Sequence, residues 1–494
     1  MESILPALSI ALKAQNIIVM AVSVFFGIIA GIIPGLGPLI AIVIFMPFSF
    51  SFPAETGIIS LLGLFIGGVY GGAITSITLG IPGTPAAAAT VLDGYPMSQK
   101  GETGKAIALA TTASVFGGIV SVLVLMTVAP LLARVALKFG PPEYTMLAIL
   151  GLTAIASVSR ESTIKGLISG ILGLLIMTIG MDMFTAYERF TFGNPELRGG
   201  IPYIATLVGI FAVSRVMVFL EEEAKRLLPP KGLAPRFPKL KEFKRLTGTY
   251  IKSSILGTGI GALPGVGTAI ASFISYAEAR RASKHPEKFG TGVPEGIVAA
   301  EAANNAVTGG ALIPMLTLAI PGDPTTAVLM GAFFMHGLLP GPRLFQEHFH
   351  VIQGFFIAML VGNIVMLFLG MYGSRLFLHA LKIEKRILIP IILVMCFIGA
   401  YSLHHSLFDI LIMWIFGVIG YIMRKLRIPL APMVLGLVLS PLVEQSLRRS
   451  LTISRGSPWI FFTRPISIGI IVGIIFLLFW PLLSERRRAI ESKG

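Results

Sequence analysis

Long apolar runs recur along almost the whole chain and constrain its fold more than any other feature. Examples are residues 107–132, 201–220, 387–400 and 466–483. Several of these runs approach the roughly 20 residues that an α-helix needs to cross a bilayer. Only 13% of the residues are charged, against about 25% in an average soluble domain. The sequence therefore predicts an all-α polytopic membrane protein.

Lysine and arginine give the chain a formal net charge of +15 and concentrate in short polar segments. These segments are KRLLPPKGLAPRFPKLKEFKRL in the middle, ARRASKHPEKFG, RKLR at 424–427 and SERRRAIESKG at the end. Basic loops beside apolar spans mark the cytoplasmic side of a membrane, so we expect the central linker and the C-terminus to be cytoplasmic. Nucleic acid is excluded as a partner, because the sequence offers no soluble domain of adequate size to bind it.

A long polar interruption divides the chain into two parts of similar length. We predict a first membrane repeat at 1–220, a cytoplasmic basic linker at 221–252, and a second repeat at 253–494 that ends in a transmembrane helix and a basic cytoplasmic tail. Matching motifs occur in both parts in the same order: GIIPGLG at 31–37 and GALPGVG at 261–267, GGA at 71–73 and 309–311, and IPGTP at 81–85 and IPGDP at 320–324. Such a duplication is typical of secondary transporters.

The two glycine-rich motifs predict re-entrant hairpins. GALPGVG lies between two basic segments, so both ends of its apolar segment are expected on the cytoplasmic side. A single crossing cannot satisfy this, whereas a hairpin with the glycines at its tip can. The GIIPGLG segment has no basic residue between positions 14 and 55, which allows its hairpin to open on the opposite side. The sequence thus predicts inverted repeats, each with a hairpin and a broken transmembrane helix.

The breaks in the apolar runs predict a polar cavity inside the membrane. Non-helical backbone is tolerated there only where it is buried in protein or lines such a cavity. Half-helix N-termini favour an anion, and unwound carbonyl groups favour a cation. Hydroxyl and amide groups flank the breaks, namely Thr75, Ser76, Thr78, Asn304, Asn305, Thr308, Thr317, Thr325 and Thr326. Each hydroxyl has the alternative of bonding back to its own helix, whereas the paired amides favour a binding site.

Few ionisable residues lie near the predicted cavity, and they are Asp93, Glu295, Glu301, Asp323 and His336. Asp323 has two interpretations, a site residue or the N-cap of a half-helix that begins with a proline. We expect Asp93 and Glu295 at the membrane boundary. The sequence shows no nucleophile elbow and no metal-ligand motif, so we predict that the protein is not an enzyme.

Several segments together resemble the large permease subunit of the tripartite tricarboxylate transporters. They are GIIPGLG, YGGAITSITLGIPG, TVLDGYPMSQKG, GIGALPGVGTAIASFISYAEARRASKHPEKFGTGVPEG, EAANNAVTGGALIPMLTLAIPG and HGLLPGP. The resemblance implies a bacterial or archaeal inner-membrane transporter that works with a small membrane subunit and an extracytoplasmic solute-binding protein. It also implies secondary, usually sodium-coupled transport of citrate or related carboxylates, and an elevator-like movement of a core with both hairpins against a scaffold.

The resemblance also implies a substrate site. Carried over by position, it consists of Gly35, Gly37, Ser76, Pro82, Gly83, Thr84, Gly265, Gly267, Asn304, Asn305, Pro321, Gly322 and Asp323, to which we add Thr325. Sodium is expected at backbone carbonyls near Pro34, Gly35, Pro264, Gly265 and Asn304, and no other cofactor is predicted. Gly80 stands where the resemblance implies an asparagine.

The leading prediction is a secondary active importer of a di- or tricarboxylate. Taking such an anion into a low-dielectric cavity is costly unless its charge is balanced. The sequence places no lysine or arginine at the breaks, so half-helix dipoles and bound cations must supply the balance, and sodium is the preferred cation. A proton-coupled carrier that uses Glu301 or Asp323, a passive anion channel and a membrane scaffold are the alternatives. The oligomeric state stays open, and a homo-oligomer is compatible with the sequence.

Overall fold

The computed structural model describes residues 4–157, 162–222, 240–373, 376, 377, 379 and 383–491. The helices of the first part are α1 (Ile4–Ala11), α2 (Ala14–Ile32), α3 (Gly37–Ser49), α4 (Ala54–Leu79), α5 (Ala88–Met97), η1 (Ser98–Glu102), α6 (Thr103–Ala136), α7 (Pro141–Ser157), α8 (Thr163–Ile176), η2 (Pro195–Gly199), α9 (Tyr203–Leu207), η3 (Val208–Val213) and α10 (Ser214–Glu221). Those of the second part are α11 (Leu240–Gly261), α12 (Gly267–Ala282), η4 (Pro286–Lys288), α13 (Pro294–Gly310), α14 (Leu312–Leu318), α15 (Pro324–Met335), α16 (Leu344–Glu347), α17 (Phe349–Tyr372), α19 (Lys385–His404), α20 (Leu407–Lys425), α21 (Leu430–Ile453), α22 (Ile460–Thr463) and α23 (Pro465–Glu491).

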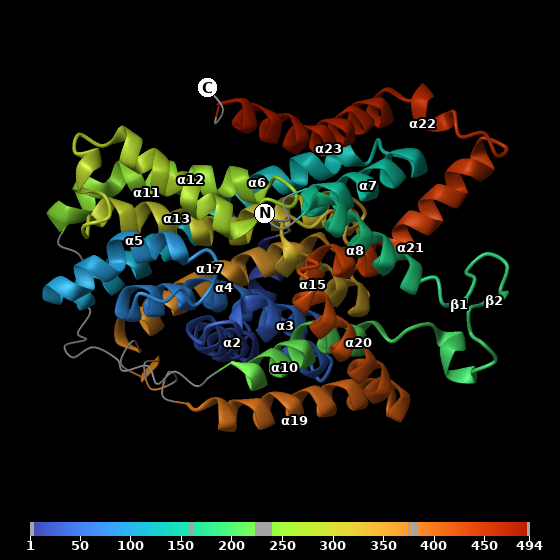
Figure 1. The fold of residues 1–494 in the computed structure, drawn as a ribbon, viewed down its shortest axis with the longest axis horizontal. Helices are drawn as coiled ribbons and strands as arrows, with labels where there is room; N and C mark the ends of the chain where they lie inside the picture. Colours follow the sequence, from blue (N-terminus) through green and yellow to red (C-terminus); the bar gives the residue numbers. More distant parts are fainter. Residues whose placement is uncertain are drawn as a thin grey trace.

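Helical segments of membrane-spanning length dominate the described residues. Seven are long and apolar enough to cross a membrane: Ala14–Ile32, Ala54–Leu79, Ala88–Ala136, Tyr203–Glu221, Phe349–Tyr372, Leu407–Lys425 and Leu430–Ile453. This confirms the predicted all-α polytopic membrane protein. A short antiparallel pair of strands, β1 (Gly180–Met181) and β2 (Glu188–Arg189), departs from the all-α prediction. It projects at one end of the molecule, and α5 and α11 reach the opposite end (Figure 1).

The predicted linker and tail both contain helix. Residues 223–239 of the linker lie outside the described residues, and α11 begins at Leu240. The helix that carries the second glycine-rich motif therefore starts inside the predicted linker. At the other end of the chain, α23 continues through the basic tail as far as Glu491.

Glycine rows on α4 determine how the first hairpin packs. Gly67 and Gly71 face α2, where an added Cβ would lie 2.2 Å from the carbonyl oxygen of Val24 and 2.3 Å from that of Ile28. Small residues in such rows let membrane helices approach closely. Gly68 of the other row packs against Pro38 at the start of α3. One face of α4 thus packs against α2, the first helix of the hairpin, and a neighbouring face packs against α3, the second helix.

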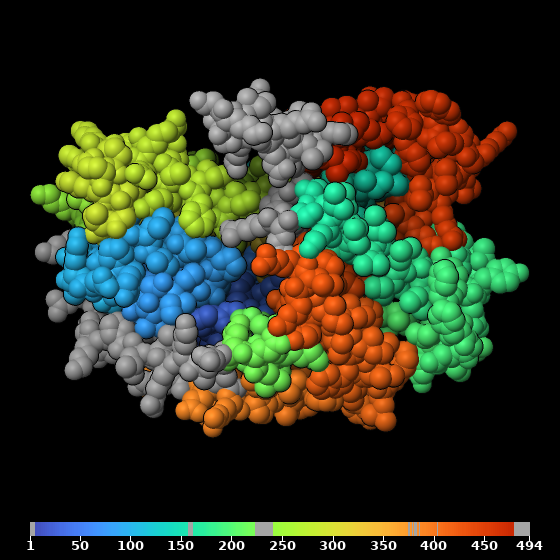
Figure 2. Space-filling view, in the orientation of Figure 1, coloured from blue at the N-terminus to red at the C-terminus, as the bar shows by residue number. Residues whose placement is uncertain are grey.

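The two parts of the chain are interleaved. α13 of the second part packs against α4, α5 and α6 of the first part, and α17 packs against α2, α4 and α6. In the space-filling view, the yellow-green surface of α11–α13 lies directly against the blue surface of the first part (Figure 2). The largest hydrophobic core cluster also draws on residues from both parts. The candidate site described below lies within this shared interior.

Candidate functional site

Both glycine-rich motifs form the turn of a helical hairpin. One turn joins α2 to α3, and the other joins α11 to α12. The backbone angle φ is +90° at Gly35 and +65° at Gly37 in the first turn, and +85° at Gly265 and +71° at Gly267 in the second. Glycine adopts these left-handed conformations without the steric cost that a Cβ brings. The paired motifs therefore produce paired turns.

The IPG motifs follow matching helix ends. α4 ends at a left-handed Gly80 with φ of +68°, and α14 ends at a left-handed Ala319 with φ of +56°. A non-glycine residue is uncommon in this conformation. Asparagine tolerates it better than most residues, so glycine in place of asparagine at position 80 preserves the backbone that the break requires.

Each break packs tightly against the first arm of its own hairpin. A Cβ added to Gly83 would lie 2.2 Å from the carbonyl oxygen of Gly31, and one added to Gly322 would lie 2.6 Å from that of Gly261. In addition, the backbone N–H of Gly265 donates to the carbonyl oxygen of Gly322 over 2.9 Å. Tip and break in each part therefore form one closely packed unit.

A cavity of about 450 Å³ lies where the tips and breaks meet. Nine of the predicted site residues line it: Gly35, Gly37, Gly83, Thr84, Gly265, Gly267, Asn304, Asp323 and Thr325. The first residues of three helices, α3, α12 and α15, also border it. Among the described residues in its wall there is no lysine or arginine, and Asp323 is the one ionisable side chain.

Five predicted site residues do not line this cavity: Ser76, Pro82, Asn305, Pro321 and Gly322. The hydroxyl of Ser76 faces the carbonyl oxygen of Gly72 in its own helix at 2.9 Å and that of Ala87 at 2.8 Å. The amide of Asn305 donates to the carbonyl oxygen of Glu301. These two side chains therefore support the protein scaffold around the cavity in this structure, and the sequence alone could not distinguish that role.

Asp323 is the N-cap of α15 as well as a lining residue. Its carboxylate accepts the backbone N–H of Thr326 over 2.7 Å, and the Thr326 hydroxyl accepts the backbone N–H of Asp323 over 2.9 Å. The helix then begins with Pro324, which lacks the N–H that would otherwise be unpaired. The predicted capping role is confirmed.

A buried polar cluster lies behind the cavity. The Glu301 carboxylate is fully buried and accepts hydrogen bonds from Thr90, from Ser114 over 3.1 Å and from the Asn304 amide over 3.5 Å. The same amide donates to the carbonyl oxygen of Val69 over 3.3 Å. The side-chain oxygen of Asn304 is buried and has no hydrogen-bond partner in the part of the chain that the structure describes. A buried, unpaired acceptor in a residue that lines the cavity suits a cation or a donor group of a ligand.

The chain matches the tripartite tricarboxylate transporter TctA family over residues 17–435. It belongs to this family. Two relatives come from Agrobacterium vitis. The uncharacterised 52.8 kDa protein of the TAR-I ttuC' 3' region is 39% identical over 479 residues, which cover 97% of this chain and 95% of the relative. The uncharacterised protein of the TAR-II ttuC' 3' region is 36% identical over 233 residues, covering 47% of this chain and 96% of the relative.

Membership confirms the resemblance stated from the sequence. TctA-family proteins are the large membrane subunits of tripartite transporters, so the chain is a multi-pass membrane protein of a transporter family. The family also implies a small membrane subunit and a binding protein as partners.

Each hairpin tip of this TctA-family chain touches a helix outside the hairpins. A Cβ on Gly35 would lie 1.9 Å from a guanidinium nitrogen of Arg215 in α10, and one on Gly265 would lie 2.7 Å from the carbonyl oxygen of Ala154 in α7. Arg215 pairs with Glu222 over 3.2 Å. Sequence reasoning missed this residue, although an arginine inside the apolar run 201–220 is a signal for a functional role.

The second half of each broken helix ends at the other part's hairpin. Asp93 of α5 is fully buried, and its carboxylate accepts three backbone N–H groups of residues 290–293 and the hydroxyl of Tyr276 in α12. His336, after α15, lies 2.9 Å from the hydroxyl of Ser49 at the end of α3 and stacks on Phe50. The first part therefore reaches the open end of the second hairpin, and the second part reaches that of the first.

Proposed function

We propose that this protein is the membrane subunit of a secondary active importer that carries a di- or tricarboxylate, is coupled to sodium and receives its substrate from an extracytoplasmic binding protein. The observation that carries the proposal is the cavity of about 450 Å³ between both tips and both breaks. Its volume is within the range of sites for small ligands. Membership of the tricarboxylate transporter family supports the substrate class.

The polarity of the cavity supports an anionic substrate. The N-terminal ends of α3 and α12 border it, and neither has a side-chain cap. A helix N-terminus carries the positive end of the dipole with unpaired N–H groups. Thr84 and Thr325 add hydroxyl groups to its wall. Because the wall has no cationic side chain among the described residues, a bound multivalent carboxylate needs further positive charge.

Sodium is the proposed source of that charge. The unpaired side-chain oxygen of Asn304 and the backbone carbonyls of the glycine-rich turns are uncharged oxygen ligands, which suit a hard monovalent cation. The ion would enter with the anion and reduce the electrostatic cost of burying it. The alternative, a proton-coupled carrier, is supported by the buried Glu301 carboxylate one turn before Asn304. A passive anion channel is the other alternative.

Inverted repeats and an elevator movement are part of the proposal. Asp93 of the first part contacts the open end of the second hairpin, and His336 of the second part contacts that of the first. These reciprocal contacts support hairpins that open on opposite sides. In this scheme the hairpins and broken helices move together. Helices such as α7 and α10, whose Ala154 and Arg215 touch the tips, form the scaffold. Gly265 and Gly35 therefore lie at the surfaces that slide.

Orientation and assembly follow from the same proposal. We place the end of the molecule that carries the basic segment after α12 in the cytoplasm, and the β1–β2 hairpin outside it. The chain then lies in the inner membrane with the central linker and the C-terminus cytoplasmic. A small membrane subunit and an extracytoplasmic binding protein complete the transporter. The proposal is also compatible with a homo-oligomer.

Uptake into proteoliposomes tests the proposal. The chain is reconstituted with its small subunit, and labelled carboxylates are offered under sodium or proton gradients, each with and without the cognate binding protein. Saturable uptake that requires sodium and the binding protein is expected. Flux that neither saturates nor responds to a gradient would indicate a channel.

Glu301→Gln separates the two modes of coupling. The substitution keeps the shape of the side chain and removes its charge and its acid–base chemistry. Sodium coupling predicts that sodium-driven uptake persists in the variant. Proton coupling predicts instead that gradient-driven uptake disappears while exchange of substrate across the membrane continues. Expression and thermal unfolding of the purified variant provide the control for folding.

A further inference from the structure

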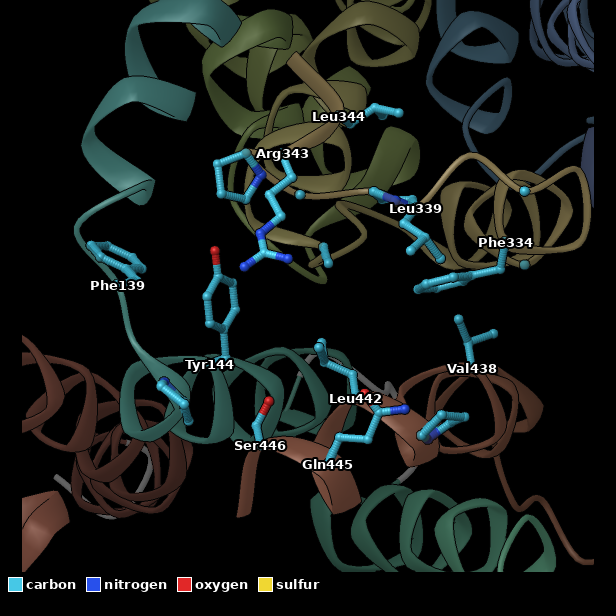
Figure 3. A pocket seen from close by; sticks show the side chains of 18 of the residues that line it. Phe139, Tyr144, Phe334, Leu339, Arg343, Leu344, Val438, Leu442, Gln445 and Ser446 are labelled. Carbon is cyan, nitrogen blue, oxygen red and sulfur yellow. The ribbon is translucent and has the colours of Figure 1, made fainter. Parts of the chain in front are cut away.

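Figure 3 shows a larger cavity, of about 690 Å³, which the start of the second break also lines. Ala319, the left-handed residue at the start of the break, lines this outer cavity, whereas Asp323, at the end of the break, lines the mid-membrane cavity. The five-residue segment from Ala319 to Asp323 therefore has one end at each cavity.

Three regions of the chain supply most of the wall of the outer cavity. They are the segment around the start of α7, the loop 337–343 that contains most of the HGLLPGP motif, and α21 between positions 437 and 449. Gly331, Phe334 and Met335 of α15 also line it. The loop is tied to the broken helix, because the backbone N–H of Gly341 donates to the carbonyl oxygen of Leu316 in α14 over 2.9 Å. A direct hydrogen bond thus joins this loop to the helix that ends at the break.

Two arginines give the outer cavity the positive charge that the mid-membrane cavity lacks. Arg343 and Arg449 both line it, and neither forms an ion pair with another described residue. The neighbouring Arg448 differs, since it pairs with Asp182 over 2.6 Å. Arg343 and the hydroxyl of Tyr144 point toward one another across the cavity (Figure 3). Glu347 and His348 also lie in this wall.

We propose that the outer cavity is a second binding site for the carboxylate, where Arg343 and Arg449 hold it before it reaches the mid-membrane cavity. The inference rests on the proposed function, and on the orientation that places this cavity on the extracytoplasmic side. Guanidinium groups match the geometry of a carboxylate and raise its local concentration. Because both arginines are exposed to water, they attract the anion without binding it so tightly that it cannot leave.

The transport test compares Arg343→Gln and Arg449→Gln with Arg455→Gln. Arg455 is an exposed arginine just after the same helix, and it does not line the cavity, which makes it a matched control. Each cavity variant is expected to raise the half-saturation concentration of the carboxylate about fivefold, with the maximal rate unchanged, and to weaken the salt dependence of uptake. Half-saturation concentrations equal to that of the control would overturn the proposal.

A binding test gives a readout that does not depend on transport. In Gln445→Cys, a thiol is placed in the cavity wall, and the one native cysteine, Cys396, is buried. Citrate is expected to slow modification of this thiol by an anionic methanethiosulfonate reagent, and the protection is expected to disappear when Arg343→Gln is added. If the parent protein imports carboxylates but citrate gives no protection, the outer site is wrong and the proposed function stands. If the parent protein imports no carboxylate, both are refuted.

Discussion

The buried amide of Asn304 offers the sharpest test of the mid-membrane cavity. Asn304→Ala removes a buried, unpaired oxygen acceptor and the two hydrogen bonds that the amide nitrogen donates. Those bonds are long, 3.3 Å to Val69 and 3.5 Å to Glu301, so their loss alone destabilises the protein little. The effect on ligand binding is expected to be larger, because Asn304 lines the cavity.

Its magnitude follows from the chemistry of a hydrogen bond to a charged ligand, which is worth roughly 1.5 to 3 kcal/mol. At about 1.4 kcal/mol per tenfold change, Asn304→Ala should raise a half-saturation concentration by roughly 10- to 150-fold. Uptake is measured against carboxylate at saturating sodium, and against sodium at saturating carboxylate. The proposed sodium role predicts that the half-saturation concentration for sodium rises more than that for the carboxylate.

Asn363 provides a matched control in α17. It is also buried, its side-chain oxygen is likewise unpaired among the described residues, and its amide donates to the carbonyl oxygen of Met359. It does not line the cavity. Asn363→Ala should therefore leave both half-saturation concentrations unchanged. If the two alanine variants behave alike, or if Asn304→Ala changes neither curve, the reasoning that places Asn304 in the binding site is refuted.

Two further predictions concern packing and pH. In Gly83→Ala the new Cβ meets the carbonyl oxygen of Gly31 at 2.2 Å, so overpacking should cost roughly 1–3 kcal/mol of stability and abolish uptake. Gly259→Ala, where the Cβ meets nothing within 4 Å, should keep both the stability and the uptake of the wild type. Equal thermal unfolding temperatures of the two variants would contradict this prediction. The Arg448 guanidinium and backbone N–H groups hold the pKa of Asp182 well below its usual range. A depressed folded-state pKa stabilises the protein above the unfolded value of about 3.9, so the stability difference between wild type and Asp182→Asn should persist from pH 7 to 5 and shrink only below about pH 4. A difference in unfolding temperature that already vanishes at pH 5 would contradict this prediction.

The sequence was informative wherever a structure depends on local chemistry. Apolar runs became helices, and glycines that need a positive φ marked the hairpin turns and the first break. The capping role of Asp323 was readable from the proline after it. At the second break, Ala319 adopts the left-handed conformation although it is not a glycine. This break was indicated by the IPGDP motif, which matches IPGTP of the first part, and not by the residue type at position 319.

Features that depend on distant segments were not predictable. Arg215 reaches the first tip from a helix roughly 180 positions away, and the sequence carries no sign of which tip it meets. The hydroxyl of Ser76 turned toward the carbonyl oxygens of its own helix and of residue 87, a choice that only packing decides. The strands β1 and β2 are two residues long, too short to leave a pattern.

The buried carboxylate of Asp93 also bears on how the chain is made. Its first backbone donor, Gly290, comes 197 positions later. At a synthesis rate of about 5–20 residues per second, the ribosome needs roughly 10–40 s to supply that donor. Until then the Asp93 carboxylate of α5 lacks the backbone N–H groups that it accepts in the folded protein. The first part of the protein therefore stays incompletely assembled in the membrane until the second part is translated.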